Sequence, residues 1–142
     1  MRRQSVLAVG AIIAMVLASA AQAEEFHARL GRVPVDSRTQ STIAGLGRVT
    51  AELDGSRFTI EGDFAGLLGP ATEANLHMGS AVGVRGPVIQ SLSISTQSEG
   101  EVTGSMQLAP DEVVALRAGR LYIQIHSEIA PEGNLWGWLL VE

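Results

Sequence analysis

Apolar and polar residues alternate along most of the chain after residue 24, which is the pattern of strands with one face on a core. The clearest example is GRVTAELDGSRFTIEGDF, residues 47–64. Every second residue is apolar on both sides of Asp54-Gly55. Alternating runs around an Asp-Gly pair predict a β-hairpin, with one face of each strand buried and the other in water.

Further short runs typical of strands follow, with turn residues between them. They are EFHARLG (25–31), PVIQSLSIS (87–95), EVTGSMQL (101–108), RLYIQIHS (120–127) and LWGWLLV (135–141). One segment, 110–118, favours a short helix, since Pro110 suits the first turn, Asp111 and Glu112 favour the N-terminal dipole, and Gly119 ends it. We therefore expect an all-β fold of about seven to eight strands, an antiparallel sandwich or barrel.

The first 23 residues have the composition of a secretory signal peptide. Arg2 and Arg3 precede an apolar run of residues 6–17, and AQA at 21–23 has the form of a cleavage site. The run is too short to span a membrane. We predict cleavage after Ala23, with ASA at 18–20 as a weaker site and an uncleaved anchor as the alternative. One domain, residues 24–142, would remain.

Charge and composition narrow the function of that domain. It holds eight arginines against fifteen carboxylates, a formal net charge of −7, and it has no lysine and no cysteine. An acidic surface repels phosphate backbones, so we expect no nucleic-acid partner. The lack of lysine excludes a Schiff base, and the lack of cysteine means that packing alone supplies stability. No second long apolar run exists, so we expect no transmembrane segment in the mature chain.

Catalytic and nucleotide-binding motifs are missing from the sequence. GLGRVT at 45–50 lacks the third glycine of a dinucleotide fingerprint, and strand-like alternation follows it. GSAVG at 79–83 has its serine in the wrong position for a nucleophile elbow. The carboxylates are spread over exposed positions, so no catalytic pair stands out. We therefore expect no enzyme activity.

The three histidines are the main candidates for chemistry. His77 and His126 both fall on the polar side of their strands, and two strands could bring them together on one sheet face. Such a pair could ligate copper or zinc, or it could be structural, with each ring bonded to a backbone group. In the structural reading, His77 would hold the glycine-rich loop 79–87 against the strand of His126. The further ligands considered for a metal are His27, Glu73, Asn75, Met78 and Glu128.

At these residues the chain resembles the CHRD domain, a module repeated in chordin and found singly in exported bacterial proteins. EFHARLGRVPVDS resembles the opening strand of that family. ANLHMGSAVGVRGPVIQSL (74–92) and the segment from LAPDEV to WGWL (108–139) resemble its two most diagnostic pieces, around His77 and His126. The resemblance covers almost all of residues 24–142. It implies an immunoglobulin-like or superoxide-dismutase-like β-sandwich outside the cytoplasm, and no catalytic residue to carry over.

Two departures from the family pattern affect the candidate site. Asn75 stands where the family often has the first histidine of a His-x-His pair, which removes one candidate ligand. Trp136 stands where arginine is common, and Trp138 lies on the same face of the last strand. We expect the two tryptophans to be partly buried, with an exposed recognition surface as the alternative.

These observations support three hypotheses of function. The first is a periplasmic or secreted, non-enzymatic binding or structural module with an unknown protein or envelope partner and no cofactor. The second is a copper- or zinc-binding protein that uses His77 and His126. The third, a redox enzyme with a copper site, rests on fold analogy alone.

Overall fold

The structure is a computed structural model that describes Ile13 and residues 22–142. Nearly all of the predicted signal peptide, 1–23, therefore lies outside the described residues. Eight strands and one helix make up the described part. They are β1 (Glu24–Arg32), β2 (Leu46–Asp54), β3 (Arg57–Ala65), β4 (Ala71–Met78), β5 (Val88–Ile94), β6 (Gly100–Gln107), α1 (Pro110–Arg117), β7 (Leu121–Ser127) and β8 (Leu135–Trp138).

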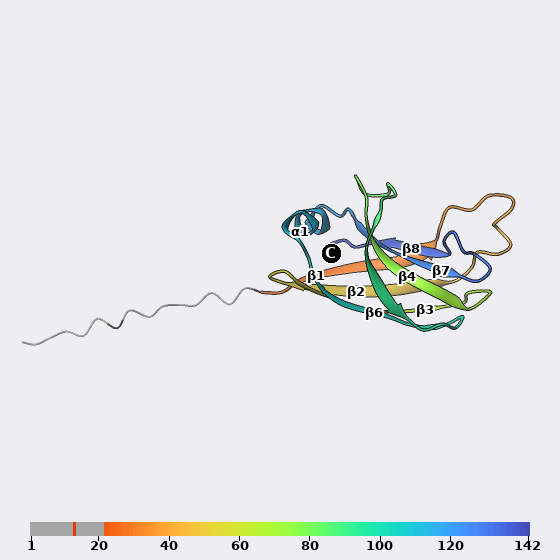
Figure 1. The fold of residues 1–142 in the computed structure, drawn as a ribbon, viewed down its shortest axis with the longest axis horizontal. Coiled ribbons are helices and arrows are strands. Elements are labelled where there is room, and N and C mark those ends of the chain that lie inside the picture. Colours follow the sequence, from red (N-terminus) through yellow and green to blue (C-terminus); the bar gives the residue numbers. More distant parts are fainter. Residues whose placement is uncertain (1–12, 14–21) are drawn as a thin grey trace, which may run out of the picture.

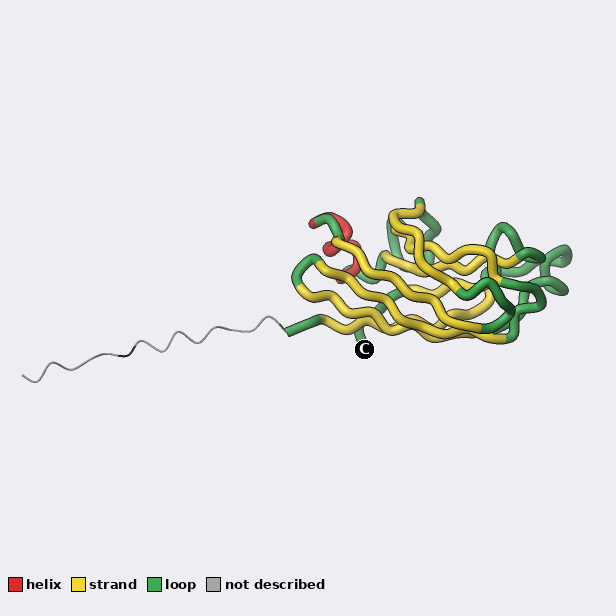
Figure 2. The backbone as a smooth tube through the Cα atoms, turned by 60° about the horizontal axis from the view of Figure 1, so that its bottom comes forward, coloured by secondary structure: helices red, strands yellow, loops and turns green. Residues whose placement is uncertain are grey.

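The strands form a closed antiparallel barrel in the order β1-β2-β3-β6-β5-β4-β7-β8. Figure 1 shows the strands running along the long axis of the molecule. Figure 2 shows the helix at one end and the longer loops at the other. The all-β class and the short helix are confirmed. The prediction of a sandwich is wrong, because β1 and β5 each pair with strands of both sheets and join the sheets into one closed barrel.

Two strands close the barrel because each pairs with both halves of the fold. The first part of β1 pairs with β2, whereas its last residues, Gly31 and Arg32, pair with β8. β5 likewise pairs with β4 through its first residues and with β6 through Ser93 and Ile94. The closure is uneven, because the seam between β5 and β6 is paired only through Ser93 with Thr103 and Ile94 with Val102.

Glycine makes the junction between β1 and β8 close enough to pair. A Cβ on Gly137 would lie 2.4 Å from the backbone oxygen of Arg29 and 2.9 Å from the side chain of Leu30. Any larger residue there would push the last strand away from the first. The short strand β8 therefore depends on Gly137 for its place in the barrel.

The hairpin predicted at Asp54-Gly55 is confirmed. β2 and β3 pair along their full lengths, from Leu46 with Ala65 to Asp54 with Arg57. The turn consists of Gly55 and Ser56, and Gly55 has a φ of 64°, which suits glycine. The alternation in the sequence thus maps directly onto inward and outward positions of both strands.

The inward positions of all eight strands form one hydrophobic core inside the barrel. Phe26, Phe58, Leu76, Ile123 and Leu135 are at the centre of it, each fully buried. Helix α1 contributes Ala115 and Leu116 to the same core. Since this core fills the interior, any binding site must lie on the outside of the barrel.

Helix α1 lies within the predicted segment 110–118. The carboxylate of Glu112 accepts a hydrogen bond of 2.8 Å from the backbone N–H of Ala109, which satisfies one donor at the start of the helix. Eight residues are far too few to cross a membrane, and residues 22–142 contain no helix that is long and apolar enough to do so.

Candidate functional site

The register of three neighbouring strands brings the candidate residues together on one outer surface. β4 and β7 pair so that Glu73 faces His126, and His77 faces Tyr122. β8 continues the sheet beside β7. We call this surface the histidine face; it consists of Glu73, Asn75 and His77 on β4, Tyr122, Gln124 and His126 on β7, and Trp136 and Trp138 on β8.

Loops cover much of the histidine face, although it lies outside the barrel. Tyr122, Gln124, Asn75 and His77 are all buried, and His77 is only 9 % exposed. The loop between β4 and β5 covers the face at His77, and the loop between β7 and β8 covers it at His126. Polar groups on this face are therefore shielded from water, which strengthens electrostatic interactions there.

His77 holds the glycine-rich loop in place, as the structural reading of the sequence predicted. Its Nδ1–H donates a hydrogen bond of 2.9 Å to the backbone oxygen of Gly86. Its ring stacks on Tyr122 with centroids 4.7 Å apart and planes 15° apart. The Tyr122 hydroxyl bonds to both the N–H and the oxygen of Gly86, at 3.0 and 3.1 Å. Strand β7 and His77 thus fix the same residue of the loop.

His126 is oriented in the same manner at the other end of the face. Its Nδ1–H donates a hydrogen bond of 2.8 Å to the backbone oxygen of Pro131. Its Nε2 lies 3.4 Å from the amide nitrogen of Gln124 and 3.9 Å from a carboxylate oxygen of Glu73. The amide of Gln124 is itself held by a hydrogen bond of 3.2 Å to the backbone oxygen of Glu132.

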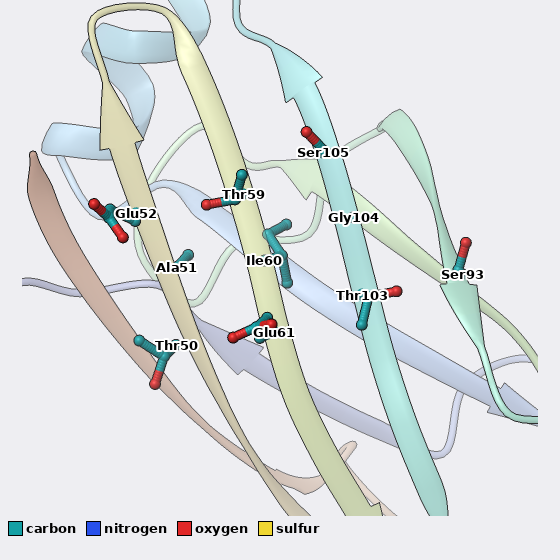
Figure 3. Close-up of a pocket in the computed structure, with 10 residues that line it drawn as sticks. All are labelled: Thr50, Ala51, Glu52, Thr59, Ile60, Glu61, Ser93, Thr103, Gly104 and Ser105. Carbon is teal, nitrogen blue, oxygen red and sulfur yellow. The ribbon is translucent and has the colours of Figure 1, made fainter.

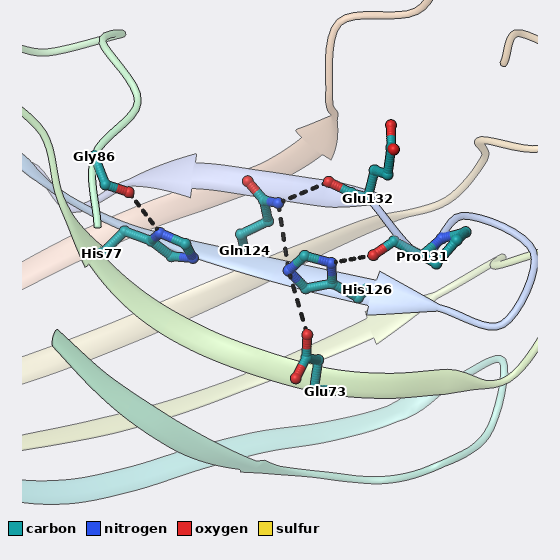
Figure 4. Close-up of polar contacts among 7 residues, drawn as sticks. All are labelled: Glu73, His77, Gly86, Gln124, His126, Pro131 and Glu132. Atoms are coloured by element: carbon teal, nitrogen blue, oxygen red, sulfur yellow. Dashed lines mark hydrogen bonds and ion pairs between the residues drawn. The ribbon is translucent and has the colours of Figure 1, made fainter. Parts of the chain in front are cut away.

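These contacts determine which nitrogen of each neutral ring carries the proton. A backbone oxygen only accepts hydrogen bonds, so Nδ1 must be the protonated nitrogen in both histidines. The Nε2 atom of each neutral ring then presents a lone pair. Figure 4 shows the Nε2 sides of His77 and His126 turned toward each other on the same face. The sequence did not reveal this convergence, because strand adjacency is not visible in it.

The Nε2 atom of His77 is buried and has no hydrogen-bond partner. Burial lowers the pKa of His77, and the charges of His126 and Arg85 lower it further, while the hydrogen bond to Gly86 and the charge of Glu73 act in the opposite direction. The ring is therefore neutral at neutral pH. An unpartnered polar atom in such a place costs about 1–3 kcal/mol, which a bound electrophile would offset.

The structure separates the other candidate ligands. Glu73 lies close to His126, and its side chain is 60 % exposed. Met78 packs against the hydrophobic core on the opposite side of β4, so the idea of a methionine ligand is wrong. His27 pairs with Glu25 on β1. Among residues 22–142, no group of three histidine, cysteine or acidic side chains is placed to hold one metal ion.

The two tryptophans are partly buried, as expected, and continue the aromatic cluster of the histidine face. Trp138 lies against Tyr122 with ring centroids 4.4 Å apart, and Trp136 meets Trp138 edge-on at 6.0 Å. The guanidinium of Arg85 lies 5.0 Å above the Trp136 ring, a cation–π contact. Sequence analysis missed Tyr122 and Arg85 as parts of this site; the only signal was their polar position in a strand or loop.

A depression of about 560 Å³ lies on another part of the surface, on the outside of β2, β3, β5 and β6. Figure 3 shows hydroxyl groups and two carboxylates along it, with Thr59 and Thr103 on neighbouring strands. Glu52 and Glu61 each lie opposite a threonine, and the lining contains no histidine. This surface therefore lacks the paired groups that make the histidine face a candidate site.

The described residues form an eight-stranded antiparallel barrel with two oriented imidazoles on its outer face. The sequence model of the CHRD domain matches residues 22–139, and the chain therefore belongs to the CHRD domain family. Neither the curated proteins nor the solved structures give a match to this chain.

Proposed function

We propose that this chain is an exported, non-enzymatic binding module of the CHRD family, and that its histidine face binds a copper or zinc ion through His77 and His126. One observation carries the proposal. Both rings donate Nδ1–H to a backbone oxygen, so both Nε2 lone pairs lie on the same shielded face. The lone pair of His77 has no partner, and that of His126 accepts only the long contact of 3.4 Å from the Gln124 amide, which a metal ion would replace. Ligating histidines in proteins are oriented in the same manner, by a hydrogen bond from the second ring nitrogen.

The geometry favours copper over zinc. Structural zinc sites use four protein ligands and catalytic ones use three, whereas two imidazoles are available here. Copper forms the most stable complexes of the divalent first-row metals with nitrogen ligands. Water or the exposed carboxylate of Glu73 would complete its coordination. The predicted signal peptide supports export, and we therefore propose a periplasmic or secreted location.

The non-enzymatic part of the proposal rests on the hydroxyl groups. Within residues 22–142, no serine or threonine hydroxyl forms a hydrogen bond with a histidine, so no nucleophile is activated by a base. The chain also has no cysteine and no lysine. A binding role is the simplest use of an oriented pair of imidazoles in such a surface.

The test is a copper and zinc titration of residues 24–142 by calorimetry at pH 7.5. We expect one ion per chain, and an affinity at least about 100-fold lower in His77→Gln and in His126→Gln, since losing a ligand exceeds the 10–100-fold effect of losing its hydrogen-bond partner. His27→Gln is the matched control, because His27 lies on β1, and it should bind like the parent chain. Circular dichroism of each variant verifies folding. Equal binding by His77→Gln and His27→Gln, or no binding by the parent chain, refutes the proposal.

A further inference from the structure

A groove of about 850 Å³ runs along the outside of β1, between β8 and β2. The two tryptophans line it on the side of β8, and two arginines line it on the side of β2. We call it the arginine–tryptophan groove; its principal residues are Arg29, Arg48, Trp136, Trp138 and Gly31. None of the residues that hold the imidazoles of the histidine face lines this groove.

The sheet register places the two arginines side by side. Arg29 on β1 pairs directly with Arg48 on β2. Like charges opposite each other in a sheet destabilise it, so such a pair needs an anion to offset the repulsion. Within residues 22–142, neither guanidinium makes an ion pair or a side-chain hydrogen bond. Asp63 faces Arg48 from β3 without forming an ion pair, and Glu142 lines one end of the groove.

Two arginines without acidic partners are unusual in a chain with this excess of carboxylates. Residues 24–142 hold fifteen carboxylates and only eight arginines, so most cations could find an acidic neighbour. Three of the eight nevertheless surround the two tryptophans, because Arg85 lies over Trp136. A local concentration of unpaired positive charge on an acidic protein attracts anions to that one place.

The tryptophans provide a flat apolar platform beside the arginines. The pairing of Gly31 with Trp136 and of His27 with Leu140 follows one register, which puts Trp138 opposite Arg29. A Cβ added to Gly31 would meet nothing within 4 Å, so the space beside Trp136 is open. The groove thus offers one apolar wall, one cationic wall and an open floor at glycine.

We infer that the arginine–tryptophan groove binds an acidic oligosaccharide whose sugar rings carry carboxylates, that is, a uronic-acid chain. Guanidinium groups bind carboxylates in a planar, two-pronged geometry, and Arg29 and Arg48 are free to do so. The C–H face of a pyranose ring packs well on an indole, and Trp138 lies directly beside Arg29. An open groove along a strand accepts a chain of rings, whereas an enclosed pocket would accept a single small molecule.

Other anionic ligands fit the groove less well. A nucleic acid would bring many phosphates close to residues 24–142, which have a formal charge of −7, and only the few arginines here would favour it. A purely apolar peptide would leave both guanidinium groups without partners, at a cost in desolvation. A sugar chain with spaced carboxylates matches both walls at once.

The test uses tryptophan fluorescence, because the only two tryptophans of the chain both line this groove. Residues 24–142 are titrated with tetra-galacturonate in EDTA, so that metal binding does not contribute. We expect a saturable change in emission, and an affinity at least about tenfold weaker in Arg48→Gln, as loss of a hydrogen bond to a charged group implies. Arg57→Gln removes an exposed arginine at the far hairpin and should bind within about twofold of the parent chain.

Several results would overturn the inference. One is the absence of any response to tetra-galacturonate. Another is an equal response to the neutral cellotetraose, which would show stacking without charge recognition. A third is an equal loss in Arg48→Gln and Arg57→Gln, which would show general attraction of anions. His77→Gln and His126→Gln should keep the uronate affinity, so this inference and the proposed metal site succeed or fail separately.

Discussion

The hydroxyl of Tyr122 gives a sharp test of how the loop over the histidine face is held. Tyr122 is 1 % exposed, and its hydroxyl forms two hydrogen bonds to Gly86, one as acceptor and one as donor. Tyr122→Phe removes both bonds and leaves the ring stacked on His77. At about 1 kcal/mol for each bond, we expect a loss of about 2 kcal/mol in the free energy of unfolding.

The assay is urea unfolding at pH 7.5, followed by circular dichroism and by tryptophan fluorescence. The midpoint should fall while the slope stays the same, because the buried area hardly changes. Ser56→Ala is the control: its hydroxyl bonds to Gln107 at 2.6 Å in an exposed turn, and we expect a change within about 0.5 kcal/mol. A loss below about 0.5 kcal/mol in Tyr122→Phe would refute the argument that these bonds fix the loop.

Three further predictions concern pH, the core and the barrel seam. Burial lowers the pKa of His77 below 6.5, so in acid the unfolded chain binds a proton more readily than the folded chain does. The contribution of His77 to stability is therefore present above pH 6.5, and the free energy of unfolding falls below that pH by at most about 1.4 kcal/mol per pH unit. In urea melts at a series of pH values, His77→Gln should lack this part of the pH dependence. Leu76→Ala should cost about 2–5 kcal/mol in the same melts, because Leu76 is fully buried, whereas the exposed Val114→Ala should stay within about 0.5 kcal/mol. Gly137→Ala should cost about 1–3 kcal/mol by forcing β8 away from Arg29, and Gly31→Ala, across the same seam but in open space, should be nearly neutral. A neutral Gly137→Ala would show that the seam tolerates a wider spacing.

Local pattern predicted most of the elements, and long-range pairing was beyond its reach. Alternation and the Asp-Gly turn located β2 and β3, and the proline and acidic residues located α1. β5 pairs with β6 only through Ser93 and Ile94, and most of its residues pair with β4 instead. No local sequence pattern shows that one strand pairs with two neighbours over different parts of its length. The sequence therefore could not decide between a sandwich and a barrel.

For the candidate site too, the sequence predicted local features and could not predict long-range contacts. Strand parity placed His77 and His126 on polar positions, and that placement is confirmed by the register. Their adjacency depends on β4 pairing with β7 across more than forty intervening residues, which parity cannot show. The sequence also could not predict that the backbone oxygens of Gly86 and Pro131 determine which ring nitrogen is protonated, because every residue has such an oxygen.

The seam between β1 and β8 has a consequence for the order in which the molecule folds. Its pairing partners, Gly31 with Trp136 and Arg32 with Leu135, come from opposite ends of the chain. During synthesis β1 leaves the ribosome long before β8, so the growing chain lacks the strand that closes the barrel. Until the last strand emerges, the nascent chain lacks the pairing that closes the barrel, and it stays incompletely folded.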